Sequence, residues 1–398
     1  MKKNVVLLLL ATLSVITFLD RNAISIASVR ITSELGLTDS QFGWILTAFT
    51  LSYGLLEIPM GLWGDRYGEK NVLLRIVLLW SAFTALTGLA GGFLSLFIIR
   101  LLFGAGEAGA YPNSAISIGK WFSPGERGRA QAWIWSASRI GGAVAPLLVI
   151  PLQQSVGWRA TFGLLGLTGA IWALIWWLTY REPDARRSDS QPTLTAGSWT
   201  IHLRSGTFWR LMVMYYCYAC GVFFFISWLP RYLQQGRGMS EDQLAWNASA
   251  PFLLAAIGCL AGGYISDWLV HKIGPEWGRK AVPAAGLMIS GISMLLAVNA
   301  ASDVWAVVFL TMGLAFMDVT APVSWALATD LGLSSSGAVT GAMNTAGLLG
   351  GTATSLGIGY LLQWTGNYHL PVTVIAVQLI AGAVCALTLS EISSSRPK

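Results

Sequence analysis

The chain has 398 residues, of which 54% are hydrophobic and only 11% are charged, and its formal net charge is +6. Soluble globular domains carry about 25% charged residues, so this composition excludes an ordinary soluble fold and predicts a protein that lies in a membrane. The basic residues form neither a stripe nor a tail, which argues against nucleic acid as a partner. The four cysteines lie inside apolar runs, so neither a disulfide nor a metal site is expected.

Apolar runs of about twenty residues, long enough to cross roughly 30 Å of hydrocarbon as helices, recur along the whole chain. They predict an all-α membrane protein with twelve transmembrane helices. The polar stretch at residues 181–205 is interpreted as a cytoplasmic linker between six-helix bundles at residues 1–180 and 206–398. The expected spans cover residues 4–28, 40–62, 72–90, 92–118, 129–152, 158–180, 207–230, 243–265, 280–300, 303–329, 336–363 and 370–391.

Lysine and arginine are distributed unevenly over the predicted loops. If the N-terminus is cytoplasmic, the inner segments hold seventeen of these residues, and the outer segments hold four, namely Arg30, Arg159, Arg231 and Arg237. Cytoplasmic loops carry an excess of basic residues, so both termini and the linker are expected in the cytoplasm. We therefore predict a multi-pass protein of a bacterial inner membrane.

Two loops at equivalent places in the two halves have similar sequences. Each contains a glycine four residues before an aspartate and then a basic cluster, which predicts a duplicated six-span unit. The loop after the eighth span contains Gly263, Asp267, Arg279 and Lys280, and the loop after the second contains Gly61, Asp65, Arg66, Gly68 and Lys70. The latter resembles the signature loop of the major facilitator superfamily. That resemblance implies two pseudo-symmetric six-helix bundles that move around a central site.

A few charged residues fall inside predicted spans, where each costs at least about 2.5 kcal/mol and therefore suggests a function. At 1.5 Å per residue, Asp20, Arg21 and Arg100 are expected at one depth near the outer face, with Glu107 deeper. We therefore expect Arg21 and Arg100 to form one basic patch with Asp20 beside it. The other charged residues that lie deep in a span, away from its ends, are Glu57, Arg139 and Asp318.

These residues have complementary chemistry. An arginine can hold a carboxylate by two parallel hydrogen bonds. A nearby arginine favours the ionised form of an acid, so a carboxylate whose arginine is taken by a substrate binds a proton more readily. Binding of the anion and of the proton would then be linked. The alternative is that Asp20 with Arg21, and Arg100 with Glu107, are structural ion pairs.

Three segments together resemble the anion:cation symporter family: Asp20 with Arg21, the run from Arg100 to Glu107, and the run from Trp228 to Gly238. The resemblance implies a proton-coupled transporter of organic anions such as hexuronates, aldonates or aldarates. In such a protein Asp20 and Glu107 would bind protons, while Arg21 and Arg100 would manage the charge of substrate and acids. The resemblance also places Tyr53 and Asn344 on the substrate side.

Other positions remain open from the sequence. Ser138 stands where sugar-acid members can carry glutamine, and the next residue, Arg139, is predicted either to bind a second carboxylate or to pair with Glu57 or Asp318. Tyr215 and Tyr218 share one helix face because they are three residues apart. They are candidate substrate contacts, and helix packing is the alternative.

The sequence therefore predicts secondary active uptake of a small organic anion, a sugar acid or another carboxylate, by proton symport. We expect a monomer in the lipid bilayer that needs no cofactor besides the coupling proton. The alternatives are an organophosphate/phosphate exchanger, favoured by three arginines within spans, proton-coupled drug efflux, and a membrane nutrient sensor that does not transport. An enzyme is not predicted, because no nucleophile with a base and no metal-ligand set is recognisable.

Overall fold

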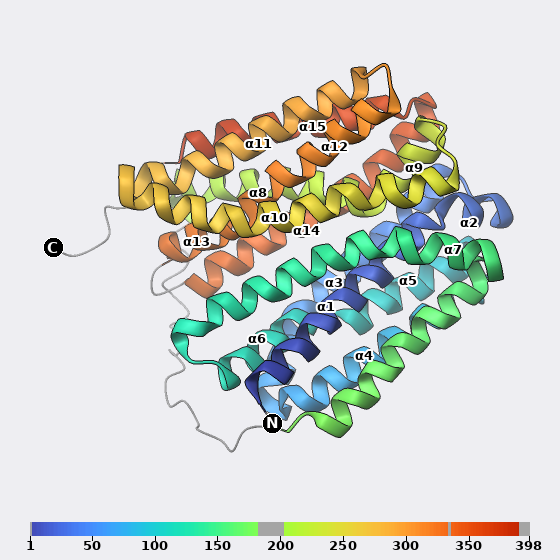
Figure 1. Cartoon of the computed structure of the whole chain (residues 1–398), viewed down its shortest axis with the longest axis horizontal. Helices are drawn as coiled ribbons and strands as arrows, with labels where there is room; N and C mark the ends of the chain where they lie inside the picture. The colour runs from blue at the N-terminus through green and yellow to red at the C-terminus, as the bar shows by residue number, and fades with distance from the viewer. Residues whose placement is uncertain (1, 182–202, 333–335, 390–398) are drawn as a thin grey trace. The chain divides into compact units, whose positions relative to one another are not determined.

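The computed structural model describes residues 2–181, 203–332 and 336–389, and within these residues the backbone forms helices and no strand. The all-α prediction is thereby confirmed (Figure 1). Most of the predicted linker lies outside the described residues. By spatial contacts the chain divides into unit 1, with Met1–Arg187, Ile226–Ser249 and Ser355–Gly366, and unit 2, with Ser188–Phe225, Ala250–Thr354 and Asn367–Lys398. The predicted boundaries at residues 180 and 206 stay a prediction.

Seven long or medium helices come from the first half of the chain. They are α1 (Lys3–Ile26), α2 (Ser28–Leu35), α3 (Asp39–Tyr67), α4 (Glu69–Thr87), α5 (Phe93–Glu107), α6 (Ala110–Trp121) and α7 (Pro124–Thr179). Helix α7 contains two predicted spans. Gly157 separates them with a non-helical φ of 76°, a conformation that favours glycine. The chain reverses its direction between these two spans, inside α7 (Figure 1).

The second half continues with helices of the same kind. They are α8 (Gly206–Ser227), α9 (Leu229–Arg231), the π-helix η2 (Tyr232–Gly236), α10 (Glu241–Ile273), α11 (Pro275–Asn299), α12 (Asp303–Asp318), α13 (Thr320–Gly332), α14 (Ser336–Thr365) and α15 (His369–Leu387). Within the described residues, nine helical stretches are long and apolar enough to cross a membrane, and one of them holds both spans of α7. Each predicted span coincides with a helix or a pair of helices.

The fourth and the tenth predicted spans are each broken in the middle. The fourth forms α5 and α6, and the tenth forms α12 and α13. In both cases the first of the two helices ends on an acid, Glu107 or Asp318. The hydropathy runs evenly through both breaks, so the sequence pattern did not predict them. Matching breaks at matching positions support the predicted duplication.

The break after Glu107 depends on two particular residues. Gly109 has a φ of 87°, and a Cβ atom there would lie 2.4 Å from the Cβ of Met60, so only glycine fits. A helix break within a bilayer frees backbone groups that must find other partners. The side-chain amide of Asn113 donates to the carbonyl oxygens of Gly109, at 2.8 Å, and Met60, at 3.1 Å. Asn113 thereby stabilises the broken helix beside the acid.

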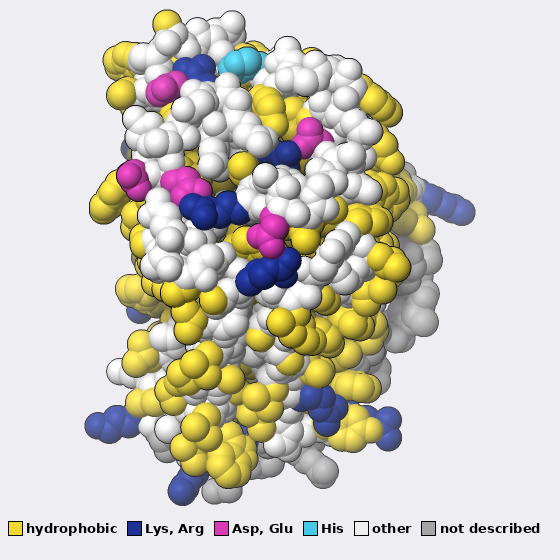
Figure 2. All heavy atoms as spheres, turned by 90° about the vertical axis from the view of Figure 1, so that its right-hand side faces the viewer, with side chains coloured by type: hydrophobic (Ala, Val, Ile, Leu, Met, Phe, Trp, Pro, Cys, Tyr) yellow, Lys and Arg dark blue, Asp and Glu magenta, His cyan; other side chains and the backbone are white. Residues whose placement is uncertain are grey.

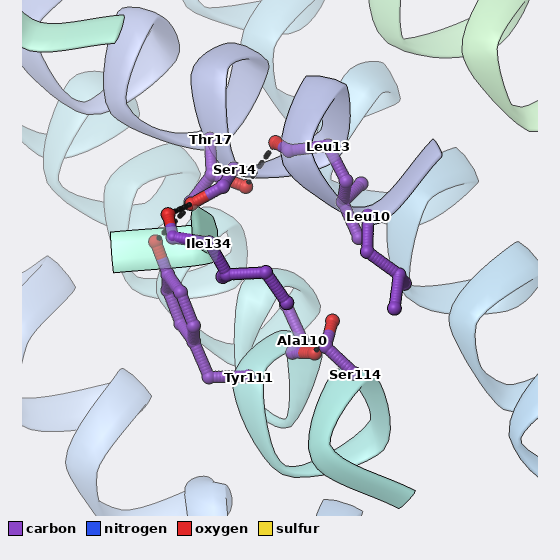
Figure 3. Close-up of a pocket in the computed structure, with 8 residues that line it drawn as sticks. All are labelled: Leu10, Leu13, Ser14, Thr17, Ala110, Tyr111, Ser114 and Ile134. Atoms are coloured by element: carbon purple, nitrogen blue, oxygen red, sulfur yellow. Dashed lines mark hydrogen bonds between the residues drawn. The ribbon is translucent and has the colours of Figure 1, made fainter. Parts of the chain in front are cut away.

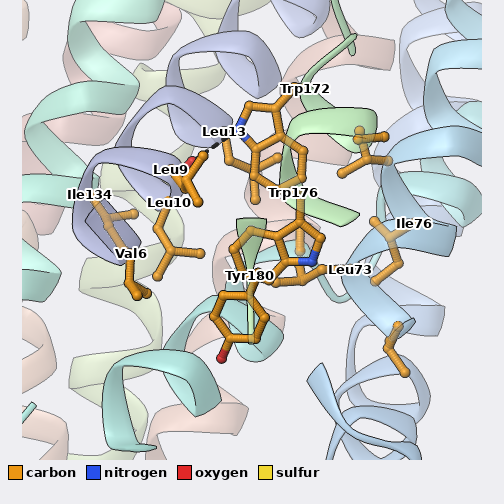
Figure 4. Packing of buried hydrophobic residues seen from close by; sticks show 14 of the residues in the cluster. Val6, Leu9, Leu10, Leu13, Leu73, Ile76, Ile134, Trp172, Trp176 and Tyr180 are labelled. Carbon is orange, nitrogen blue, oxygen red and sulfur yellow. Dashed lines mark hydrogen bonds between the residues drawn. The ribbon is translucent and has the colours of Figure 1, made fainter. Parts of the chain in front are cut away.

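The core of unit 1 lies between α1, α4 and α7 (Figure 4). Buried tryptophans need a partner for the indole N–H. Trp172 donates to the carbonyl oxygen of Leu9 at 3.0 Å, and Trp176 donates to that of Lys70 at 3.1 Å. The ring of Trp176 stacks on Tyr180 at 4.0 Å. These tryptophans therefore hold α7 to α1 and to the start of α4.

Arginines at the predicted outer ends of helices pair with acids inside unit 1. Arg30 makes two hydrogen bonds to Glu241, of 2.8 and 2.6 Å, and Arg231 pairs with Asp39. Arg159 bonds to Glu34 at 2.9 Å, and hydrogen bonds from Trp158 and Arg159 hold the pKa of Glu34 below its usual value. Figure 2 shows acidic side chains next to Lys or Arg side chains on the face at the right of Figure 1. Three of the four arginines expected outside are therefore neutralised by neighbours.

The signature loop joins α3 to α4. Gly68 ends α3 with a φ of 84°, and a Cβ on Gly61 would lie 3.2 Å from Pro112 of α6. The Arg66 guanidinium lies 5.3 Å from the ring of Tyr67. The backbone oxygen of Lys70 is the acceptor for Trp176 described above. The side chain of Asp65 lies outside the described part of the structure.

Helices α1 and α7 lie close together at Gly141, where a Cβ atom would lie 2.4 Å from the carbonyl oxygen of Val15. We expect Gly141→Ala to lower the unfolding temperature in detergent, because overpacking of this kind costs about 1–3 kcal/mol and exceeds the gain in helix propensity. The matched control is Gly163→Ala on the same helix, where nothing lies within 4 Å of the new Cβ. Equal unfolding temperatures of the two variants would contradict the close contact.

Candidate functional site

Asp20 and Arg21 are neighbours in α1, yet their side chains leave the helix in different directions, since successive residues are about 100° apart around a helix. Asp20 is 1% exposed and accepts a hydrogen bond of 3.3 Å from the hydroxyl of Thr84 on α4. Arg21 points instead toward α3 and α5. The two charges therefore serve different helix contacts.

Arg21 forms an ion pair with Glu107, the last residue of α5. The Nε of Arg21 lies 2.5 Å from Oε1 of Glu107, and the two side chains are 12% and 1% exposed. The pair is not fully satisfied: Nη2 of Arg21 and Oε2 of Glu107 are buried and have no hydrogen-bond partner within the described residues. Unmade hydrogen bonds of buried groups are costly, so each atom is ready for a further partner. The pair thus offers a donor for an anion and an acceptor for a proton.

Four aromatic rings surround the guanidinium of Arg21. Its Cζ lies 5.4 Å from the ring centroid of Phe18, 5.2 Å from that of Phe49, 4.6 Å from that of Tyr53 and 5.9 Å from that of Tyr111. Such contacts stabilise a cation in a desolvated place. The prediction named Tyr53 only.

Two of these aromatic residues also have contacts with other side chains. The hydroxyl of Tyr53 donates to Glu57 at 3.3 Å on the same helix. The ring of Tyr111 stacks on Trp135 of α7, with centroids 5.0 Å apart and planes 5° apart. Tyr111 follows Glu107 by four residues in the sequence, the one signal that could have identified it, but the break at Gly109 hides this spacing.

Arg100 contacts other aromatic rings than Arg21 does. It is 2% exposed, its guanidinium lies 4.7 Å from the ring of Phe103, and its Nε has no hydrogen-bond partner within the described residues. Arg100 attracts both Asp20 and Glu107 electrostatically. The ion pair that the structure shows among these four residues is Arg21 with Glu107, between α1 and α5. The single basic patch of Arg21 and Arg100 stays a prediction.

Ser138 and Arg139 lie on α7, which packs along α1. The hydroxyl of Ser138 donates to the carbonyl oxygen of Trp135 at 2.6 Å, so it is occupied by its own helix. Arg139 is 5% exposed, and its guanidinium lies 5.6 Å from the ring centroid of Phe18. Arg139 therefore shares an aromatic neighbour with Arg21.

A small pocket lies beside Tyr111 (Figure 3), lined by Leu10, Leu13, Ser14, Thr17, Ala110, Tyr111, Ser114 and Ile134. It has no room for a water molecule. The hydroxyls of Ser14 and Tyr111 lie 3.0 Å apart, and Ser14 donates to the carbonyl oxygen of Ile134. This pocket is a packing gap whose hydrogen bonds orient Tyr111.

In unit 2, the predicted tyrosines of α8 lie next to each other, with ring centroids 5.3 Å apart. Tyr218 donates a hydrogen bond of 2.9 Å to Asp318. Tyr215 packs against α14: a Cβ on Gly347 would lie 2.7 Å from its ring. Asn344 precedes Gly347 by three residues on that helix. Tyr218 is thus hydrogen-bonded to the acid at the end of α12, and Tyr215 packs against α14. Their contact with substrate stays a prediction.

The described part of the chain shows no candidate metal site. Within residues 2–181, 203–332 and 336–389, no three His, Cys, Asp or Glu side chains are grouped as ligands of an ion.

Comparisons with known proteins agree with this architecture. The chain is 31% identical to a probable sulfoacetate transporter of Cupriavidus necator, over 98% of this chain and 94% of that protein. It is also 31% identical to the hexuronate transporter of Bacillus subtilis, over 91% and 89%, and 30% identical to a probable L-galactonate transporter of Escherichia coli, over 96% and 88%.

Among solved structures, a bacterial homolog of the human lysosomal transporter Spinster matches with a TM-score of 0.78 and 23% identity, over 97% of this chain and 96% of that one, which shows the same fold. The family model of the Major Facilitator Superfamily matches residues 10–355. The chain is therefore a membrane transporter rather than an enzyme, and it belongs to the Major Facilitator Superfamily.

Proposed function

We propose that this protein takes up a small organic anion, a sugar acid or a related carboxylate, together with protons across the inner membrane of a bacterium. Both termini lie in the cytoplasm in this proposal. The observation that carries it is the Arg21–Glu107 pair, which is largely shielded from solvent and leaves the buried atoms Nη2 of Arg21 and Oε2 of Glu107 without partners in the described residues. Four aromatic rings surround the guanidinium of Arg21 in this pair.

The pair supports coupling because substrate and proton act on the same contact. An acid group of the substrate that binds Arg21 competes with Glu107 for the guanidinium. The carboxylate of Glu107 then loses its counterion in apolar surroundings, where a charged form is costly, and a proton compensates for this loss. Each ligand therefore favours binding of the other, which is what symport requires. Asp20 near Arg100 is the second proton site of the proposal.

The names of the relatives support an organic acid as substrate. Hexuronate and galactonate carry one carboxylate, whereas sulfoacetate carries two acid groups. Galactarate and glucarate, which appear in the name of a further relative, also carry two. All of these are anions at neutral pH, as the arginines of unit 1 require. We therefore extend anion transport to this chain.

The test is uptake into liposomes that contain the purified protein. We expect labelled acids from a panel of hexuronates, aldonates, aldarates and sulfonated acids to accumulate when the outside is more acidic than the inside, and a protonophore to abolish accumulation. Counterflow of sugar phosphates driven by inorganic phosphate, with no need for a pH gradient, would select the exchanger instead. Transport of apolar cations alone would select drug efflux.

A further inference from the structure

The run from Trp228 to Gly238 belongs to the family resemblance but has no role in the proposed mechanism. Its first turn lies in unit 1, and a backbone hydrogen bond of 2.8 Å from Tyr232 to Trp228 closes it. Arg231 lies on this turn and is only 5% exposed, although the hydropathy pattern places it in an outer loop. A buried charge is costly, so the burial of Arg231 calls for a reason.

The guanidinium of Arg231 lies between aromatic rings and polar side chains. Its Cζ is 5.6 Å from the ring centroid of Phe42 and 6.0 Å from that of Trp228, and both rings are buried. Nη2 pairs with Asp39, and Nε donates to Gln235 at 3.0 Å. Nη1 of Arg231 and Nε1 of Trp228 are buried donors without a hydrogen-bond partner among the described residues. This turn therefore has N–H groups left for a further acceptor.

The arrangement repeats that of Arg21 and Glu107. In both places an arginine contacts aromatic rings, pairs with an acid through one nitrogen and keeps another nitrogen buried without a partner in the described chain. The acids differ, because the side chain of Glu107 is 1% exposed, whereas that of Asp39 is 24% exposed and lies in the first turn of α3. Water and the positive end of the helix dipole stabilise Asp39 as an anion even without the arginine. An incoming acid group can therefore replace Asp39 without the binding of a proton.

Helix α1 connects the surroundings of the two arginines. Ser25 follows Arg21 by four residues, one turn of α1, and its hydroxyl donates to the carbonyl oxygen of Ser227, the neighbour of Trp228. This contact lies nearer to the predicted outer face than Arg21, by about 6 Å along the helix. An anion that moves inward along α1 therefore meets the turn of Arg231 before it meets Arg21.

From these contacts we infer that Arg231 forms a second anion site, the outer anion site, at which an acid group of the substrate replaces Asp39 before it reaches Arg21. An acid group that bonds to both Nη1 and Nη2 makes one more hydrogen bond than Asp39 makes. Carboxylates and sulfonates both fit, because each offers negative charge and several acceptor oxygens. The inference rests on the proposed function and adds a binding site to it.

The first experiment measures uptake of labelled galactonate into bacterial cells, in which every copy of the protein has one orientation. Arg231→Gln is expected to raise the KM at least about tenfold, because a hydrogen bond to a charged group is lost, and to leave the slope of uptake against outer pH unchanged. Arg231→Lys keeps the charge but not the fork, so its KM should be intermediate, and it replaces Arg231→Gln if that variant does not fold. A lower maximal rate with an unchanged KM would make Arg231 a structural residue and overturn the inference.

The matched control is Arg30→Gln. Arg30 also belongs to the predicted outer end and pairs with an acid, Glu241, but its side chain is 37% exposed. This variant should keep the KM of the wild type. Equal increases of the KM in Arg30→Gln and Arg231→Gln would trace the effect to the loss of any outer charge and contradict a specific site.

A binding measurement separates the outer anion site from the proposed function. Because Trp228 lies beside the guanidinium of Arg231, galactonate or sulfoacetate should change the tryptophan fluorescence of the purified protein even in Arg21→Lys. The change should disappear when Arg231→Gln is added to Arg21→Lys, and its persistence, or its absence from Arg21→Lys, would refute the outer anion site. A change that depends on Arg231, without uptake of any acid, would refute the proposed function and leave the outer anion site standing.

Discussion

Arg21→Lys is expected to reduce uptake of the organic anion by about tenfold to a hundredfold. This is the loss that follows when one hydrogen bond to a charged group disappears. Lysine keeps the positive charge, but its ammonium group has no planar fork. It can bond to Glu107, as Arg21 does through Nε, yet it offers no second N–H in the position of Nη2. It also loses the contact of the guanidinium with the ring of Tyr53, 4.6 Å away. Initial rates of uptake in liposomes over a range of substrate concentrations measure the effect.

Lysine is the informative substitution here, because Arg21→Ala would leave Glu107 buried without a counterion and cost about 3–5 kcal/mol of stability. The matched control is Arg75→Lys, an exposed residue of α4 whose guanidinium lies over the ring of Trp63. That variant should transport normally. Normal uptake by Arg21→Lys, with an unfolding temperature equal to that of the wild type, would remove Arg21 from the proposed mechanism.

Glu107→Gln is expected to separate transport from the proton gradient. The amide oxygen of glutamine can still accept the hydrogen bond from Arg21, so substrate exchange between equal concentrations should continue. Glutamine does not bind or release a proton, so accumulation driven by an acidic outside should fall at least about tenfold. Wild-type uptake should rise as the outer pH falls from 8 to about 6, whereas uptake by Glu107→Gln should be flat across this range.

Glu126→Gln is the control for this measurement. Hydrogen bonds from Lys3 and Ser123 lower the pKa of Glu126 to about 2, so this carboxylate stays ionised at every pH of the assay. Its substitution should leave the slope of uptake against pH unchanged. A slope retained by Glu107→Gln as well would show that the coupling proton binds elsewhere, with Asp20 as the first residue to examine.

The sequence by itself determined the class of fold and the inventory of the site. Membrane helices are visible because hydropathy is a local property, and each run of about twenty apolar residues must cross the bilayer in some way. Charges inside such runs stand out for the same reason, and in unit 1 Asp20, Arg100, Glu107 and Arg139 are buried while Arg21 is partly buried. The signature loop sufficed to indicate the superfamily.

Only the tertiary structure decided which charges meet. The depth of each residue in the membrane predicted that Arg21 lies near Arg100. Depth does not tell in which direction a side chain leaves its helix, nor which helices lie side by side. The break at Gly109 ends α5 at Glu107, and the side chain of Arg21 reaches that acid from α1 to form the ion pair. Tyr111 joins the site because α6 restarts after the same break. Contacts between helices depend on long-range packing, which a linear pattern of hydropathy does not record.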